Sequence, residues 1–174
     1  MRKDTTKKSV PMSSLSTSSM EIDESQITFT QAIAGAKFMN GDTLLARITP
    51  CLENGKTAFV SFLDDGEVAV GSTEFIVMRS KSLNPYMVYC IARSDDFRQI
   101  AINSMTGADG RQRVKTDKIE VIGYQHPTQV LIDACEEKLK PMFDYISLLD
   151  KEIIRAQQAR DALLPKLMSG ETEV

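Results

Sequence analysis

The sequence predicts a mixed α/β (α+β) domain followed by one long C-terminal α-helix. Four short apolar runs between residues 43 and 80 are separated by Gly, Asn and Asp turn signals, as short β-strands are. After Pro127 the pattern changes. From Thr128 to Leu164 there is no glycine, and apolar residues alternate steps of three and four, which is the period of a coiled-coil helix. A chain of 174 residues has room for one such domain with an appendage.

Composition and charge exclude several classes of protein. With 42% hydrophobic and 26% charged residues, the chain is typical of a soluble globular protein, and no apolar run approaches the roughly 20 residues that span a membrane. The basic start has no apolar stretch behind it that would make a signal peptide. A net charge of −3 argues against indiscriminate coating of nucleic acid, but it leaves room for a local basic face.

Cysteine and histidine usage predicts neither a disulfide framework nor a metal site. Cys51, Cys90 and Cys135 have no CxxC spacing, and His126 has no Cys or His at ligand spacing. We therefore expect free thiols and a cytoplasmic location.

The expected elements follow the chain in order. Residues 1–20, rich in Ser, Thr and Lys, are expected to form a disordered lead-in. The four apolar runs are the predicted strands: 43–49, 56–63, 67–72 and 74–80. Two short helices are then expected between residues 84 and 105, the second capped by Ser94 or Asp95. After a glycine loop, KIEVIGYQHP is predicted to form one more short strand.

The C-terminal helix carries an apolar seam with heptad spacing. At 1.5 Å per residue it would be roughly 55 Å long if continuous. Pro141 is expected to bend it or to delay its start to Lys140–Pro141, and Pro165, Ser169 and Gly170 are expected to mark its end. The seam suits either one helix of a bundle or, as we favour, a coiled coil with a helix that this chain lacks. The seam residues are Leu139, Met142, Ile146, Leu149, Ile153, Ala156, Arg160 and Leu163.

No common catalytic motif is present, since the chain lacks GxSxG, Walker A, GxGxxG and HExxH patterns. Glu53 and Lys56 in LENGK have the spacing of a nuclease ExK pair. The glycine between them favours a turn, and no carboxylate cluster at Mg²⁺ spacing supports a nuclease.

The stretch GADGRQRVKTD at 107–117 is the strongest local signal for an anion contact. Gly107 and Gly110 permit backbone conformations that bring N–H groups close to an anion. If 111–115 is extended, Arg111, Arg113 and Lys115 share one face. A phosphate backbone and an ordinary solvated strand edge fit this pattern equally well.

Four blocks in order resemble the specificity (S) subunit of type I restriction–modification systems: GDTLLARITPCLENGKTAFV, GSTEFIVMR, MTGADGRQRVKTDKI and LLPKLMSGETEV. The resemblance runs from about residue 20 to 174. It implies that residues 21–126 form a target recognition domain, that 127–168 form a ruler helix pairing antiparallel with a second one, and that 169–174 are a tail. In length the chain departs from the family, because a full subunit carries two recognition domains and two helices. A dimerising half-subunit, a fragment and a remnant all remain open.

The resemblance implies a non-enzymatic DNA-recognition subunit that reads half of a split site. Its expected partners are double-stranded DNA, the methyltransferase (modification) subunit, a restriction subunit, and a second copy or second half. No cofactor is expected in this chain, while partner subunits would use S-adenosylmethionine, ATP and Mg²⁺. The alternative is an assembly module that docks through its helix and reads no DNA.

The DNA-contact candidates are polar residues of three blocks, and the loop arginines are expected on phosphates rather than bases. They are Arg47, Thr49, Asn54 and Lys56 in the first block, Ser72, Thr73 and Glu74 in the second, and Arg111, Gln112, Arg113 and Lys115 in the third. A solvated turn explains Ser72–Glu74 equally well.

Overall fold

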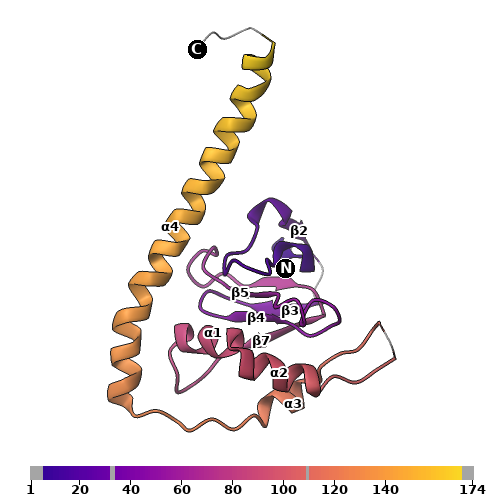
Figure 1. The fold of residues 1–174 in the computed structure, drawn as a ribbon, viewed down its shortest axis with the longest axis vertical. Coiled ribbons are helices and arrows are strands. Elements are labelled where there is room, and N and C mark those ends of the chain that lie inside the picture. The colour runs from indigo at the N-terminus through magenta and orange to yellow at the C-terminus, as the bar shows by residue number, and fades with distance from the viewer. Residues whose placement is uncertain (1–5, 32–33, 109, 170–174) are drawn as a thin grey trace, which may run out of the picture. The chain divides into compact units, whose positions relative to one another are not determined.

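The computed structural model describes residues 6–31, 34–108 and 110–169 (Figure 1). The chain divides into two compact units, residues 1–136 and 137–174, which are described separately.

Two small sheets form the framework of the first unit. The first has the order β2-β1-β6-β3, with β1 and β6 parallel and the other pairs antiparallel. The second is antiparallel, with the order β5-β4-β7. The strands are β1 (Lys7–Val10), β2 (Thr28–Thr30), β3 (Ala36–Phe38), β4 (Thr43–Ala46), β5 (Thr57–Phe59), β6 (Ala69–Gly71) and β7 (Phe75–Met78). Two 3-10 helices, η1 (Met12–Ser14) and η2 (Glu24–Gln26), lie between β1 and β2.

Strand β4 separates two hydrophobic clusters. All four of its residues are buried, and successive side chains of a strand point to opposite faces. Leu44 accordingly packs in the cluster that contains Val10 and Phe38, whereas Leu45 packs with Phe97 and others in the second cluster. This continuous burial explains why Leu44, Leu45 and Ala46 are apolar in succession rather than alternating with polar residues.

Three helices of the first unit follow β7. α1 (Pro85–Arg93) begins where the Asn84 side chain accepts from the Met87 N–H (2.9 Å). α2 (Asp95–Asn103) begins where the Ser94 hydroxyl accepts from the Phe97 N–H (3.3 Å), as predicted. α1 contacts β4 and β5. α3 (Thr116–Glu120) lies where a strand was predicted, so that prediction is wrong. Among the apolar residues of the predicted strand, Ile119 lies in α3 and is buried, whereas Val121 follows α3 and is 76% exposed.

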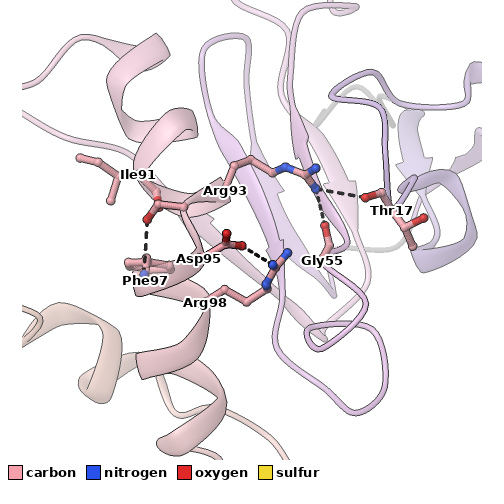
Figure 2. A network of polar contacts seen from close by, with 8 residues as sticks. Thr17, Gly55, Ile91, Arg93, Asp95, Phe97 and Arg98 are labelled. Atoms are coloured by element: carbon pink, nitrogen blue, oxygen red, sulfur yellow. Dashed lines mark hydrogen bonds and ion pairs between the residues drawn. The ribbon is translucent and has the colours of Figure 1, made fainter.

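Residues 6–20 are ordered, which corrects the predicted disordered lead-in; residues 1–5 lie outside the described residues. β1 pairs with both β2 and β6, and Val10 and Leu15 are at most 1% exposed. A side chain of α1 also donates hydrogen bonds to residues 6–20 and to the 51–55 turn. Arg93 Nη1 donates to the carbonyl oxygens of Thr17 (3.3 Å) and Gly55 (2.7 Å), as Figure 2 shows. The polar sequence of residues 6–20 gave no sign of a strand. Strand β1 is nevertheless held in place by main-chain pairing, and two side chains of this segment lie in the core.

The long helix is α4 (Gln129–Met168), which begins in the first unit and makes up the described part of the second except Ser169. It runs through Pro141 and Pro165. The expectation that it begins at Lys140–Pro141 is therefore wrong, and Pro165 lies inside the helix rather than at its end. The fold class, a mixed α/β domain with a long C-terminal helix, is confirmed.

Candidate nucleic-acid interface

Strands β4 and β7 bring the first two blocks of candidates together. Ala46 is paired with Phe75 at the end of this antiparallel ladder, so the next residues outward, Arg47 and Glu74, are also neighbours. The Arg47 N–H donates to the Glu74 carbonyl oxygen at 3.0 Å. This end of the β4–β7 ladder is the base of the candidate interface.

The third block lies alongside the first through main-chain hydrogen bonds. Thr49 N–H donates to Gln112 O at 3.0 Å, and Val114 N–H donates to Arg47 O at 2.9 Å. Arg113 also forms isolated β-bridges with Ile48 and with Thr106. Segments 47–49 and 111–114 are thus held side by side at the base of the glycine loop.

Glu74 and Arg113 form a side-on ion pair across these blocks. Arg113 Nε lies 2.9 Å from both Glu74 carboxylate oxygens, and Nη2 lies 2.8 Å from Oε1. The hydrogen bond from Arg113 lowers the pKa of the Glu74 carboxyl, and the charge of Arg47 lowers this pKa further. Arg47, Glu74 and Arg113 are called the arginine–glutamate cluster below.

Two polar atoms, one in this cluster and one next to it, have no hydrogen-bond partner among the described residues. They are Arg47 Nε and Thr49 Oγ1, both buried at the atom level. A buried donor or hydroxyl left without a partner costs about 1–3 kcal/mol. Ordered water commonly supplies the missing partner of such buried atoms.

The glycine loop has the backbone geometry that the sequence predicts. Gly107 (φ 133°) and Gly110 (φ 78°) lie in the region that favours glycine, while Asp109 lies outside the described residues. A Cβ at Gly107 would lie 3.1 Å from the Arg111 carbonyl oxygen, so a larger residue would crowd this loop. Val114 is fully buried and Arg111 and Lys115 are exposed, but Gln112 and Arg113 are both partly buried, so the full alternation over 111–115 stays a prediction.

Asn54 and Lys56 lie on the turn after β4, and the structure does not bring their side chains into the arginine–glutamate cluster. Asn54 is exposed on the 51–55 turn, whose Gly55 carbonyl is held by Arg93 (Figure 2). Lys56 Nζ donates to the Met12 carbonyl oxygen at 3.1 Å, which ties this cation to η1.

Ser72 and Thr73 shape the turn that carries Glu74. The Ser72 hydroxyl accepts from the Glu74 N–H at 3.1 Å, and Ser72 O accepts from Phe75 N–H at 3.1 Å. Thr73 is exposed. This turn joins β6 of one sheet to β7 of the other, so it fixes Glu74 relative to both sheets.

Thr106 is a site residue that the sequence reading missed. It exchanges two main-chain hydrogen bonds with Arg113, Arg113 N–H to Thr106 O at 2.9 Å and Thr106 N–H to Arg113 O at 3.0 Å. A signal was present, because two extended residues flanking a glycine-containing turn are the pattern of a hairpin.

No group of three or more His, Cys, Asp or Glu side chains that could hold a metal occurs within residues 6–31, 34–108 and 110–169. Glu53 therefore belongs to no such group in these ranges. The three cysteines are free thiols. In the same described ranges, no helix is both long and apolar enough to cross a bilayer.

The seam residues of α4 are accessible to solvent along the second unit. Met142, Ile153 and Leu163 are 52–60% exposed, and Ile146 and Leu149 are about 40% exposed. Large apolar side chains off the seam, such as Tyr145 (60%) and Leu148 (51%), are exposed as well, so the heptad spacing rather than exposure alone indicates a helix that pairs with another helix.

Comparison with curated proteins found two relatives from Escherichia coli. The chain is 39% identical over 141 residues to the specificity subunit of the type I restriction enzyme EcoEI, a match that covers 78% of this chain and 23% of that subunit. It is 40% identical over 79 residues to the EcoAI specificity subunit, covering 44% of this chain and 13% of that subunit. The chain thus spans about a quarter or less of each relative. No family model matches.

Comparison with solved structures found the same fold. The HsdS subunit from Thermoanaerobacter tengcongensis superposes with a TM-score of 0.60 at 18% identity, covering 91% of this chain and 41% of that one. A chain from a structure on complex assembly and conformational transition of a type I R-M system gives a TM-score of 0.58 at 17% identity, covering 97% of this chain and 44% of that one.

Proposed function

This chain is homologous to the specificity subunits of type I restriction enzymes, and from that premise we propose that its first unit reads part of a DNA target sequence. The observation that carries the proposal is the convergence of three blocks, distant in sequence, on the end of the β4–β7 ladder. Polar side chains on loops held by a rigid sheet suit hydrogen bonding to base edges in the major groove.

The charge around the cluster supports a DNA partner despite the acidic chain. Within segments 47–49, 72–74 and 111–115, Arg47, Arg111, Arg113 and Lys115 supply four positive charges against one negative charge from Glu74, while Asp109 and Asp117 flank the third segment in sequence. Arg111 and Lys115 are exposed and lie on either side of the buried Val114, so we assign them to phosphates, which set register and orientation. The net charge of −3 leads us to expect weak DNA binding by the isolated chain.

For α4 we propose antiparallel pairing with a second ruler helix, from another copy or from a second half, and docking of methyltransferase subunits. The exposed seam supports this assignment, because lone helices do not keep large apolar side chains in water without a partner. Arg160 within the seam would set the register of the pair rather than its strength.

The chain itself is proposed to be non-enzymatic and to bind no cofactor. Methylation and cleavage would belong to modification and restriction subunits using S-adenosylmethionine, ATP and Mg²⁺, in a cytoplasmic complex. In this view reading half of a split site is the whole contribution of the first unit.

Enrichment from a randomised duplex pool tests the proposal. The full-length protein is immobilised, incubated at low ionic strength with duplexes randomised over about two helical turns, and the retained duplexes are sequenced. We expect base preferences at fixed positions. Retained duplexes with the base composition of the input at every position would contradict DNA reading.

An assembly module that reads no DNA is the second candidate, and the exposed seam of α4 is the observation that favours it. Such a module would bind a modification subunit through α4 while retaining duplexes without base preference. The pool experiment therefore separates the two candidates directly.

A further inference from the structure

We propose that Arg113 reads a guanine through the major groove and that Glu74 is the positioning residue that aims its guanidinium. This inference rests on the proposed function, because it names the base contact made by one side chain of the arginine–glutamate cluster. It departs from the expectation that the arginines of the glycine loop lie on phosphates.

The side-on geometry of the ion pair leaves one edge of the guanidinium available. Glu74 occupies the edge formed by Nε and Nη2, at 2.8–2.9 Å. The remaining edge carries the N–H groups of Nη1 and the outer N–H of Nη2, and Nη1 makes a long 3.5 Å contact with the Arg111 carbonyl. Two parallel N–H donors on one edge match the O6 and N7 acceptors of guanine.

The charge balance of the pair favours a base over a phosphate for Arg113. The Glu74 carboxylate compensates the guanidinium charge and would lie close to any phosphate that Arg113 contacted, so the two anions would repel. Within the described part of the chain, Arg111 forms no ion pair, and its charge is available to a phosphate. The two arginines are thus expected to take different roles.

Arg113 is also held in position before any ligand binds. Its main chain exchanges two hydrogen bonds with Thr106, and Glu74 is fixed by Ser72 Oγ and by the Arg47 N–H. The Arg113 side chain is 43% exposed while that of Glu74 is 25% exposed, so the arginine is the more accessible of the pair. A preorganised side chain loses less conformational entropy on binding, which strengthens discrimination between bases.

The test extends the pool experiment to variants of the full chain, with each protein's affinity then measured on duplexes that differ at one base pair. For the wild type we expect one position where guanine is preferred over adenine by roughly 5- to 150-fold. Arg113→Gln should shift that one position toward adenine, because Gln pairs bidentately with adenine, and leave the other positions unchanged. Glu74→Gln should keep the guanine preference but reduce its size.

Arg111→Gln is the matched control, since it removes a neighbouring exposed arginine and should weaken all duplexes alike. A uniform loss for Arg113→Gln, with every base preference retained, would overturn the inference in favour of a phosphate contact or a structural link. If Arg113→Gln fails to fold, as circular dichroism would reveal, Glu74→Gln carries the test, and undiminished guanine discrimination then overturns the positioning role. A wild type with no base preference anywhere overturns the proposed function itself, and this inference with it.

Discussion

At the scale of single residues, the Glu74–Arg113 pair joins the turn between β6 and β7 to the segment after the glycine loop. Neither residue type is informative in isolation, since a Glu on a turn and an Arg on an extended segment are usual surface residues. Their pairing depends on two strands and a hairpin that bring positions 39 residues apart within hydrogen-bond distance. Sequence reading placed both residues among the candidates but gave no sign that they contact each other.

The pair predicts a pH-dependent contribution to stability. The pKa of Glu74 is lowered in the folded protein by the hydrogen bond from Arg113. A carboxyl with a depressed folded-state pKa stabilises the fold above its ordinary value, 4.5, and that contribution is lost as the pH falls through the folded-state pKa. Glu74→Gln should therefore lower the free energy of unfolding at pH 7, and its difference from wild type should shrink below about pH 4.5.

Urea denaturation at several pH values between about 2.5 and 7 measures this difference on both sides of the expected change. Glu120→Gln, an exposed change on α3, serves as the control and should leave stability unchanged within about 0.5 kcal/mol. A pH-independent difference between Glu74→Gln and wild type would count against the ion pair.

The phosphate assignment predicts a change in salt dependence. Replacing Arg111 and Lys115 with Ala should weaken binding to all duplexes alike and reduce the slope of log affinity against log salt by about one to two, since each lost phosphate contact removes roughly 0.9. Lys81→Ala is the control, because this exposed lysine follows the opposite end of β7 from Glu74. An unchanged slope in the double variant would contradict the assignment.

At the scale of elements, the predicted strands and helices are confirmed where the apolar pattern is strong. They are wrong or missing where main-chain pairing or long-range contacts determine the secondary structure. Each of the four apolar runs contains a strand, and the Ser94 cap was predicted. β1 was missed because KKSV carries no apolar run, and it is held by hydrogen bonds to β2 and β6. α3 was misread because closely spaced Ile and Val residues fit a strand as well as one helical turn.

The ordered lead-in gives the element-scale prediction. Leu15→Ala should cost about 2–5 kcal/mol of stability, because Leu15 is 1% exposed within the core cluster of Val10 and Phe38. Ser13→Ala, an exposed change in the same segment, should be nearly neutral. Chemical denaturation compares the two, and equal stability of both variants and wild type would mean that this segment does not belong to the core.

At the scale of the whole molecule, the seam on α4 predicts self-association or association with a partner chain. If two copies pair through it, Ile146→Asp with Ile153→Asp should convert a dimer to a monomer in light scattering, because each introduces a charge into an apolar interface. Lys151→Asp, off the seam on the same helix, should leave the mass unchanged. A wild type that is monomeric at every concentration would rule out the homodimer and leave the seam to another chain.

A two-fold symmetric dimer would read a palindromic split site, since the symmetry of a DNA-binding protein is mirrored in its target. Base-specific reading by the first unit predicts a large specificity ratio, which is the affinity for the preferred duplex divided by the affinity for an unrelated one. Titration of the full chain with the most enriched duplex and with a scrambled duplex of equal composition measures it. We expect at least about a 100-fold difference in affinity, because each recognised base pair contributes about 1–3 kcal/mol. Equal affinity for the two duplexes would mean that the chain does not read base sequence.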